Sequence, residues 1–212
     1  MRHAATRRRI VRDAELHFCR RGDHRMGMAA TQTHWTVDMV QALPDDGQRH
    51  EIMDGELFVT PSPSYDHQVA ILRLTLRIAP YLAAHRAGYL FFAPGDVAFD
   101  RHTLVQPDLF VVPLVQGKRP RTWEEAGRPL LAVEVLSPST ARVDRVRKRE
   151  LYQRQGVPEY WIVDLDARVI ERWRPEELRP EILTDRITWA PNEAAEPLTI
   201  ELAEYWHEVF DA

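Results

Sequence analysis

Residues 130–137 form an almost wholly apolar segment with a single carboxylate, Glu134, inside it. Such a short apolar run predicts a buried β-strand. An uncompensated carboxylate in a core is strongly unfavourable, so Glu134 requires a partner or a place beside a bound cation. Because side chains of a strand alternate, Glu134 shares one face with Ala132 and Leu136, and the opposite face stays apolar.

The 212-residue chain is 44% apolar and 28% charged, which is typical of a globular domain with a substantial core. No apolar run reaches the roughly 20 residues that a spanning helix needs, and no apolar signal core begins the chain. We therefore expect a cytoplasmic protein without a membrane partner. The lone Cys19 excludes an internal disulfide and a thiolate zinc site.

Charge is distributed unevenly along the chain. Residues 1–27 hold eight Arg and three acidic residues, a net charge of +5, which leaves −9 for residues 28–212 of a chain whose total is −4. We expect residues 1–27 to be a basic, disordered extension and residues 28–212 to form one domain. Phosphate contacts from Lys and Arg dominate nucleic-acid affinity, so an acidic domain that binds nucleic acid needs local positive charge.

Caps, turns and periodicity predict an alternation of helices and strands. Thr36 caps a short helix, and Asp54 and Gly55 suit the tight turn of a hairpin. Ser64 precedes a helix over residues 65–86, with its arginines outside. We place the core face of this helix at Val69, Leu72, Leu76, Ile78, Ala79 and Leu82. Further strands are expected at 89–92, 96–99, 109–113, 130–136, 159–164, 168–173, 181–189 and 198–202, and helices at 123–126, 141–155 and 203–210.

Three acidic residues and one lysine are the candidate catalytic residues of the sequence. Glu56 lies in an early strand, Asp108 begins a strand after Pro107, Glu134 lies in the central strand, and Lys148 lies on the next helix. Mg²⁺ or Mn²⁺ takes oxygen ligands, so Asp108 and Glu134, with the carbonyl of Val135, could hold such an ion. The set suits hydrolysis of a phosphodiester.

Lys148 is the favoured lysine because the chain has 26 Arg and only two Lys, and Lys118 lies in a loop. Asp144, Lys148 and Tyr152 form one i, i+4, i+8 row on a helix, so Asp144 can orient the ammonium group. An ordinary surface Asp–Lys pair explains the same spacing.

Positive charge on this helix could bind substrate. Arg142, Arg145 and Arg149 share one stripe, and Ser139 lies where the free N–H groups of a helix start favour an anion. His67 could face the same site. A solvated helix face, helix capping and a structural histidine are the alternative explanations of these residues.

These residues together resemble the Uma-two family of restriction-type endonucleases. The motifs that carry the resemblance are residues 54–57, 61–67, 106–109, 133–140 and 156–164, with Lys148 and Tyr152. The resemblance implies a PD-(D/E)XK nuclease fold of the α/β (α+β) class, in which helices flank a mixed sheet, here with additional C-terminal strands. It implies that Asp108 and Glu134 are the site acids and that Glu56 completes the site. Leu136 occupies the usual place of the lysine, which Lys148 replaces.

Three functions compete. The first is a metal-dependent DNA endonuclease, which could act as a homodimer because enzymes that cut both strands are often symmetric. The second is a nuclease-fold protein that binds nucleic acid or a partner without cutting, which the acidic domain and Leu136 favour. The third is a nuclease for RNA or branched DNA. Three acids beside one lysine favour cleavage over binding alone.

Overall fold

A computed structural model of the chain describes residues 34–192 and 196–211, all within the compact unit Thr33–Ala212. The basic extension expected over residues 1–27, and the boundary at residue 28, lie outside the described residues. No helix in the described part combines the length and the apolar character needed to cross a membrane.

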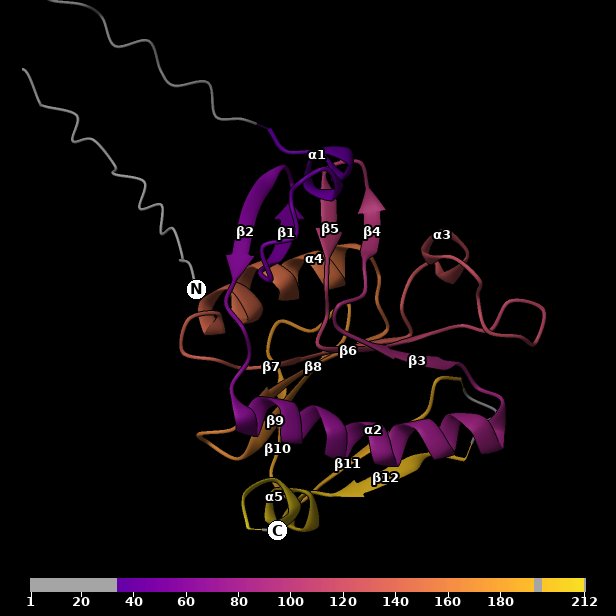
Figure 1. The fold of residues 1–212 in the computed structure, drawn as a ribbon. Coiled ribbons are helices and arrows are strands. Elements are labelled where there is room, and N and C mark those ends of the chain that lie inside the picture. Colours follow the sequence, from indigo (N-terminus) through magenta and orange to yellow (C-terminus); the bar gives the residue numbers. More distant parts are fainter. Residues whose placement is uncertain (1–33, 193–195, 212) are drawn as a thin grey trace, which may run out of the picture. The chain divides into compact units, whose positions relative to one another are not determined.

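The described residues alternate between helices and strands much as predicted (Figure 1). The helical elements are α1 (Val37–Gln41), α2 (Tyr65–His85), α3 (Trp123–Ala126), the π-helical segment η1 (Val143–Lys148), α4 (Arg149–Arg154) and α5 (Leu202–Phe210). The strands are β1 (Arg49–Met53), β2 (Glu56–Thr60), β3 (Tyr89–Phe92), β4 (Val97–Asp100), β5 (Thr103–Val105), β6 (Leu109–Val112), β7 (Leu131–Val135), β8 (Glu159–Asp164), β9 (Val169–Trp173), β10 (Glu181–Leu183), β11 (Arg186–Trp189) and β12 (Leu198–Glu201).

A mixed six-stranded sheet forms the centre of this part of the chain, in the order β10-β9-β8-β7-β6-β3. Its β7 and β8 are parallel and its other neighbours are antiparallel. A four-stranded sheet has the order β2-β1-β5-β4, and β11 pairs with β12. The prediction of a mixed sheet flanked by helices, with additional C-terminal strands, is confirmed.

The alternation along β7 divides the core into two clusters. Val133 and Val135 pack in the cluster that contains residues of α2 and α5. Ala132 belongs to the cluster that contains residues of α4, β1 and β4, and the partly buried Leu136 packs against it. Accordingly α2 lies on one side of the central sheet and α4 on the other, toward the four-stranded sheet (Figure 1). Glu134 therefore faces the four-stranded sheet.

The hairpin of β1 and β2 forms as its turn sequence predicts. Asp54 and Gly55 both have positive φ, 51° and 80°, as the two central residues of this tight turn require. A side chain at Gly55 would also meet the ring of His34, since an added Cβ would lie 2.2 Å from it. The turn sets the register in which Glu51 lies opposite Phe58 and Met53 opposite Glu56.

Two local predictions were wrong. The sequence predicted no strand between residues 99 and 109, but β5 lies there, and its three residues are all buried. The predicted face of α2 was wrong in part: Ile78 and Leu82 are buried as expected, but Leu72 and Leu76 are 52% and 55% exposed, whereas Leu74, which the prediction left out, is fully buried. The prediction assumed that the arginines of α2 face solvent. Arg73 and Arg77 instead bind Glu208 of α5 at a helix–helix contact.

The buried face of α2 can be tested by replacing leucine with alanine at two nearby positions of the helix. Leu74→Ala is expected to lower the free energy of unfolding by about 2–5 kcal/mol, because it leaves a cavity in the core. Leu76→Ala, on the same helix, is expected to change it by less than about 0.5 kcal/mol. Urea unfolding measures both, and a larger loss for Leu76→Ala would contradict the burial that we describe.

Candidate active site

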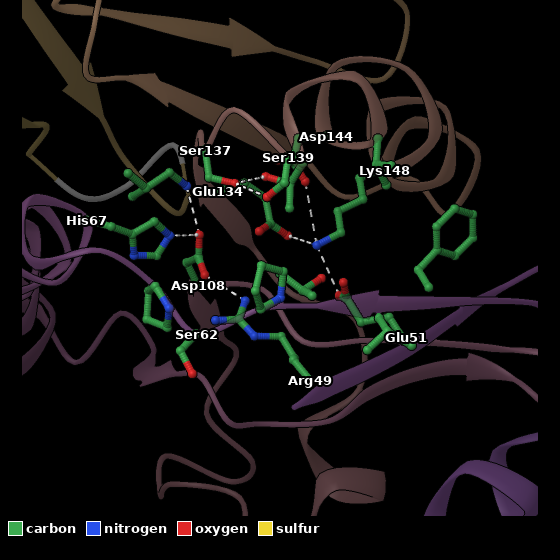
Figure 2. A pocket seen from close by; sticks show the side chains of 18 of the residues that line it. Arg49, Glu51, Ser62, His67, Asp108, Glu134, Ser137, Ser139, Asp144 and Lys148 are labelled. Atoms are coloured by element: carbon green, nitrogen blue, oxygen red, sulfur yellow. Dashed lines mark hydrogen bonds and ion pairs between the residues drawn. The ribbon is translucent and has the colours of Figure 1, made fainter. Parts of the chain in front are cut away.

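A pocket of about 220 Å³ lies where the two sheets and the segment after β7 meet. Its lining includes Asp108, Glu134 and Lys148, three of the residues selected from the sequence, and adds Arg49 and Glu51 of β1. Figure 2 shows Lys148 reaching between Glu134 and Glu51, while Arg49 points toward Asp108.

Strand pairing brings the two principal acids together. Strands β6 and β7 are antiparallel with Leu109 opposite Val133, so continuing the register by one residue places Asp108 opposite Glu134. Both carboxylates are 2% exposed. Residues 26 positions apart in the sequence thus meet at one point of the pocket.

Asp108 is held as an anion by three donors. Arg49 Nη1 donates to its Oδ1 at 2.7 Å, while His67 Nε2 lies 3.0 Å from its Oδ2 and the Val135 N–H donates to that oxygen at 2.8 Å. Burial alone would favour the neutral acid, but the hydrogen bond and charge of His67, the charge of Arg49 and the Val135 N–H outweigh it. Together they lower the pKa of Asp108 to about 2.

Glu134 lies in a second cluster, around the buried ammonium of Lys148. Lys148 Nζ is 2.9 Å from Glu134 Oε1, 3.0 Å from Glu51 Oε1 and 3.7 Å from Asp144 Oδ1. The Tyr152 hydroxyl also donates to Glu134 Oε1, at 3.3 Å. The predicted row of Asp144, Lys148 and Tyr152 therefore faces the core, so it is not an ordinary surface pair.

The charges of this cluster depend on one another. Burial opposes the charge of Lys148, but Glu134, Glu51 and Asp144 outweigh it and raise the pKa of Lys148 well above its usual value. Burial, partly offset by Lys148, raises the pKa of Glu134 well above its usual value and also raises that of Asp144. One ammonium group does not fully compensate three buried carboxylates, so the cluster favours an additional positive charge.

The structure places Glu56 outside this pocket and Glu51 inside it. Glu56 is 47% exposed and forms an ion pair with Arg147 at 2.8 Å, at the turn end of the hairpin. Glu51, 1% exposed, accepts the Gln106 N–H at 2.7 Å and contacts Lys148. The sequence held a signal for Glu51 that we did not use: like Glu134, it is an acid in a strand, on the same face as the buried Met53.

The residues expected to bind substrate separate into two groups. Ser139 and His67 line the pocket, and the Ser139 hydroxyl lies 3.1 Å from that of Ser137. Arg142, Arg145 and Arg149 do not line it. Arg145 is paired with Asp164 and Glu171, and Arg149 lies over the ring of Trp173. The arginine stripe is therefore largely engaged with protein groups.

The donor chemistry of the pocket fits a hard divalent cation. Four carboxylates, those of Glu51, Asp108, Glu134 and Asp144, face the fixed cations Arg49 and Lys148. No group of three or more His, Cys, Asp or Glu side chains in residues 34–192 and 196–211 is arranged as a metal cage. Mg²⁺ is commonly held by one or two carboxylates with waters, so Asp108 and Glu134 are sufficient in number for it.

Comparison with known proteins agrees with this fold. A model of the Uma2 family, described as "Putative restriction endonuclease", matches residues 37–203. The chain belongs to the Uma2 family. The Uma2 family match confirms the resemblance drawn from the motifs. A crystal structure from Anabaena variabilis ATCC 29413, described as a "putative nuclease belonging to DUF820", is also similar, with a TM-score of 0.67 and 19% identity over 83% of this chain and 99% of that chain. Comparison with curated proteins gave no match.

Removing the buried ammonium is expected to destabilise the fold in a pH-dependent way. Lys148→Met leaves Glu134, Glu51 and Asp144 without their common cation, a change that costs about 3–5 kcal/mol at neutral pH. Because Glu134 and Asp144 have raised pKa values in the folded state, protonating them relieves this penalty. The loss should therefore shrink as the pH falls toward the unfolded-state values of about 4. Denaturant unfolding across this pH range measures it.

Arg147→Met is the matched control, because Arg147 lies one residue away and its pair with Glu56 is exposed on both sides. We expect this variant to lose less than about 1 kcal/mol, with little pH dependence. Equal losses in the two variants would contradict the description of Lys148 as the centre of a buried cluster.

Proposed function

We propose that this protein is a metal-dependent endonuclease that hydrolyses DNA phosphodiester bonds in the pocket of Asp108, Glu134 and Lys148. The observation that carries the proposal is the pairing of two buried carboxylates across neighbouring strands, in one pocket with a buried lysine. Burying charge opposes folding unless each charge is compensated. A purely structural core would therefore not require this arrangement.

Asp108 and Glu134, with the carbonyl of Val135, would hold Mg²⁺ or Mn²⁺. When bound, such an ion lowers the pKa of a water and offsets the negative charge that builds on the phosphoryl group. The chain itself holds both side chains in place for a cation, because Arg49 and His67 keep Asp108 ionised and Lys148 fixes the position of Glu134 through a hydrogen bond of 2.9 Å.

Lys148 would contribute its own charge to the reaction. Its pKa is raised by the surrounding carboxylates, so the ammonium stays protonated at neutral pH. Glu51 and Asp144 hold it in place, and a preorganised cation stabilises a phosphoryl group that gains negative charge without having to reorganise. Glu51 is thus a positioning residue, and it takes the place that the sequence had assigned to Glu56.

Hydroxyl groups of the segment after β7 would also meet the phosphate. Ser137, Ser139 and Thr140 line the pocket, and the Ser137 hydroxyl lies within 3.1 Å of the other two. Hydroxyls donate to phosphate oxygens without carrying charge, and such contacts position a strand without reading its sequence.

Plasmid nicking in Mg²⁺ or Mn²⁺ tests the proposal. We expect the parent protein to nick, EDTA to abolish nicking, and Glu134→Gln to reduce it by roughly 100-fold or more, because the amide keeps the size of the side chain but removes a cation ligand. The cleavage rate and the thermal melting temperature are measured together, so that a loss of activity is separated from unfolding.

Glu56→Gln is the matched control, since it makes the same change at the exposed acid. It should nick at the parental rate, whereas Glu51→Gln should be slowed because Lys148 loses one anchor. Nicking that survives EDTA, or that is equal in the parent and in Glu134→Gln, would contradict the metal-dependent mechanism. DNA binding by a parent that never cuts would favour the non-cleaving alternative. Cleavage of both strands would support a homodimer as the acting unit.

A further inference from the structure

A second hollow adjoins the catalytic pocket and has a different chemical character. Its volume is about 370 Å³, and it shares Arg49, Asp108 and residues 60–63 with the first pocket. Beyond these shared residues its lining includes one large aromatic side chain, Phe92, and three glutamines, Gln48, Gln68 and Gln106. We refer to this hollow as the amide pocket.

The aromatic side chain of Phe92 is exposed to solvent and is not packed in the core. Phe92 ends β3, an edge strand of the six-stranded sheet, and is 57% exposed. The next two residues, Ala93 and Pro94, continue the wall of the amide pocket. An exposed aromatic ring beside a hollow of mixed polar and apolar lining offers a surface on which a flat ligand can stack.

The charges of the amide pocket do not favour a phosphate group. Its one basic residue, Arg49, is already bound to Asp108 at 2.7 Å, and Asp45 adds a negative charge. The glutamines instead offer neutral groups that can recognise the edges of nucleobases. Gln48 and Gln106 already donate to Asp46 and Asp96, at 3.1 and 2.8 Å, so these two contribute mainly their amide oxygens as acceptors, while Gln68 can both donate and accept. A ring for stacking and amides for hydrogen bonding match a base better than they match a backbone phosphate.

We propose that the amide pocket binds one unpaired nucleobase of the strand whose phosphate lies in the catalytic pocket. This inference rests on the proposed nuclease function and deepens it by naming the substrate class, a strand with at least one unpaired nucleotide at the cleavage point. A base inside a duplex is stacked and paired, so it reaches a separate pocket only when it is single-stranded or turned out of the helix.

Two arginines at the turn end of the β1–β2 hairpin agree with this substrate class. Arg147 and Arg154 are engaged with Glu56 and Asp54, each at 2.8 Å. These acids partly neutralise the two arginines, which therefore contribute less to binding the backbone of a duplex. Binding of a duplex depends on many phosphate contacts. Base stacking, which is less dependent on net charge, supplies affinity to an acidic protein.

The test compares binding of two fluorescent DNA oligonucleotides, one with bases and one with abasic sites at its central positions, by anisotropy. The full chain is used, once in EDTA and once in Ca²⁺, and uncut oligonucleotide is confirmed on a gel. We expect the parent to prefer the base-bearing strand and Phe92→Ala to weaken that binding roughly tenfold, the loss typical of one stacked base. Phe92→Ala should leave binding of the abasic strand within about twofold of the parent.

Tyr89→Ala is the matched control, because Tyr89 is an exposed aromatic residue of the same strand, 41% exposed, and lines neither pocket. It should bind both strands as the parent does, and Phe92→Tyr, which keeps a ring, should restore the preference. The inference is overturned if the parent shows no preference for the base-bearing strand, if Phe92→Ala weakens both strands equally, or if Tyr89→Ala matches Phe92→Ala.

Failure of this inference is distinct from failure of the proposed function. If the parent nicks plasmid but Phe92→Ala binds like the parent, the nuclease proposal stands and the base-site proposal fails. If the parent never cuts but its preference for bases depends on Phe92, the base-site proposal stands and the nuclease proposal fails. An RNA oligonucleotide of the same sequence, measured alongside, shows whether the base is taken from DNA or from RNA.

Discussion

The ion cluster of Lys148 links the elements on which the pocket depends. A single buried ammonium contacts Glu134 of the central strand β7, Glu51 of β1 and Asp144 one helical turn before it. Because each charge would be costly without the others, strand, hairpin and helix must come together for any of them to be buried. The same ammonium thus joins the six-stranded sheet to the four-stranded sheet at the place where the pocket opens.

The charge of Asp108 is compensated by contacts separate from those of the Lys148 cluster. Arg49, His67 and a backbone N–H hold Asp108 ionised, whereas three acids share Lys148. One acid therefore keeps its charge over the whole range near neutrality, and the other lies in a cluster deficient in positive charge. The two opposed acids are therefore held by different protein donors and do not compete for the same ones.

Local features were predicted well because their causes are local. Asp54 and Gly55 form the expected turn, and Thr36 and Ser64 cap the expected helices through their side-chain oxygens. The buried face of α2 was predicted only in part, because Arg77 binds Glu208, a residue 131 positions away. Distant ion pairs of this kind make arginine an unreliable marker of the solvent-facing side of a helix.

The sequence alone determined the alternation along β7, the hairpin, the helix caps and the selection of Asp108, Glu134 and Lys148 as candidates, since these depend on residue order and spacing. Only the tertiary structure decided that Glu51 lies at the pocket and Glu56 outside it, that Arg145 of the arginine stripe is engaged by acids, and that Phe92 borders a second hollow. The physical reason is that burial and ion pairing depend on strand register and sheet packing, which join residues far apart in the chain.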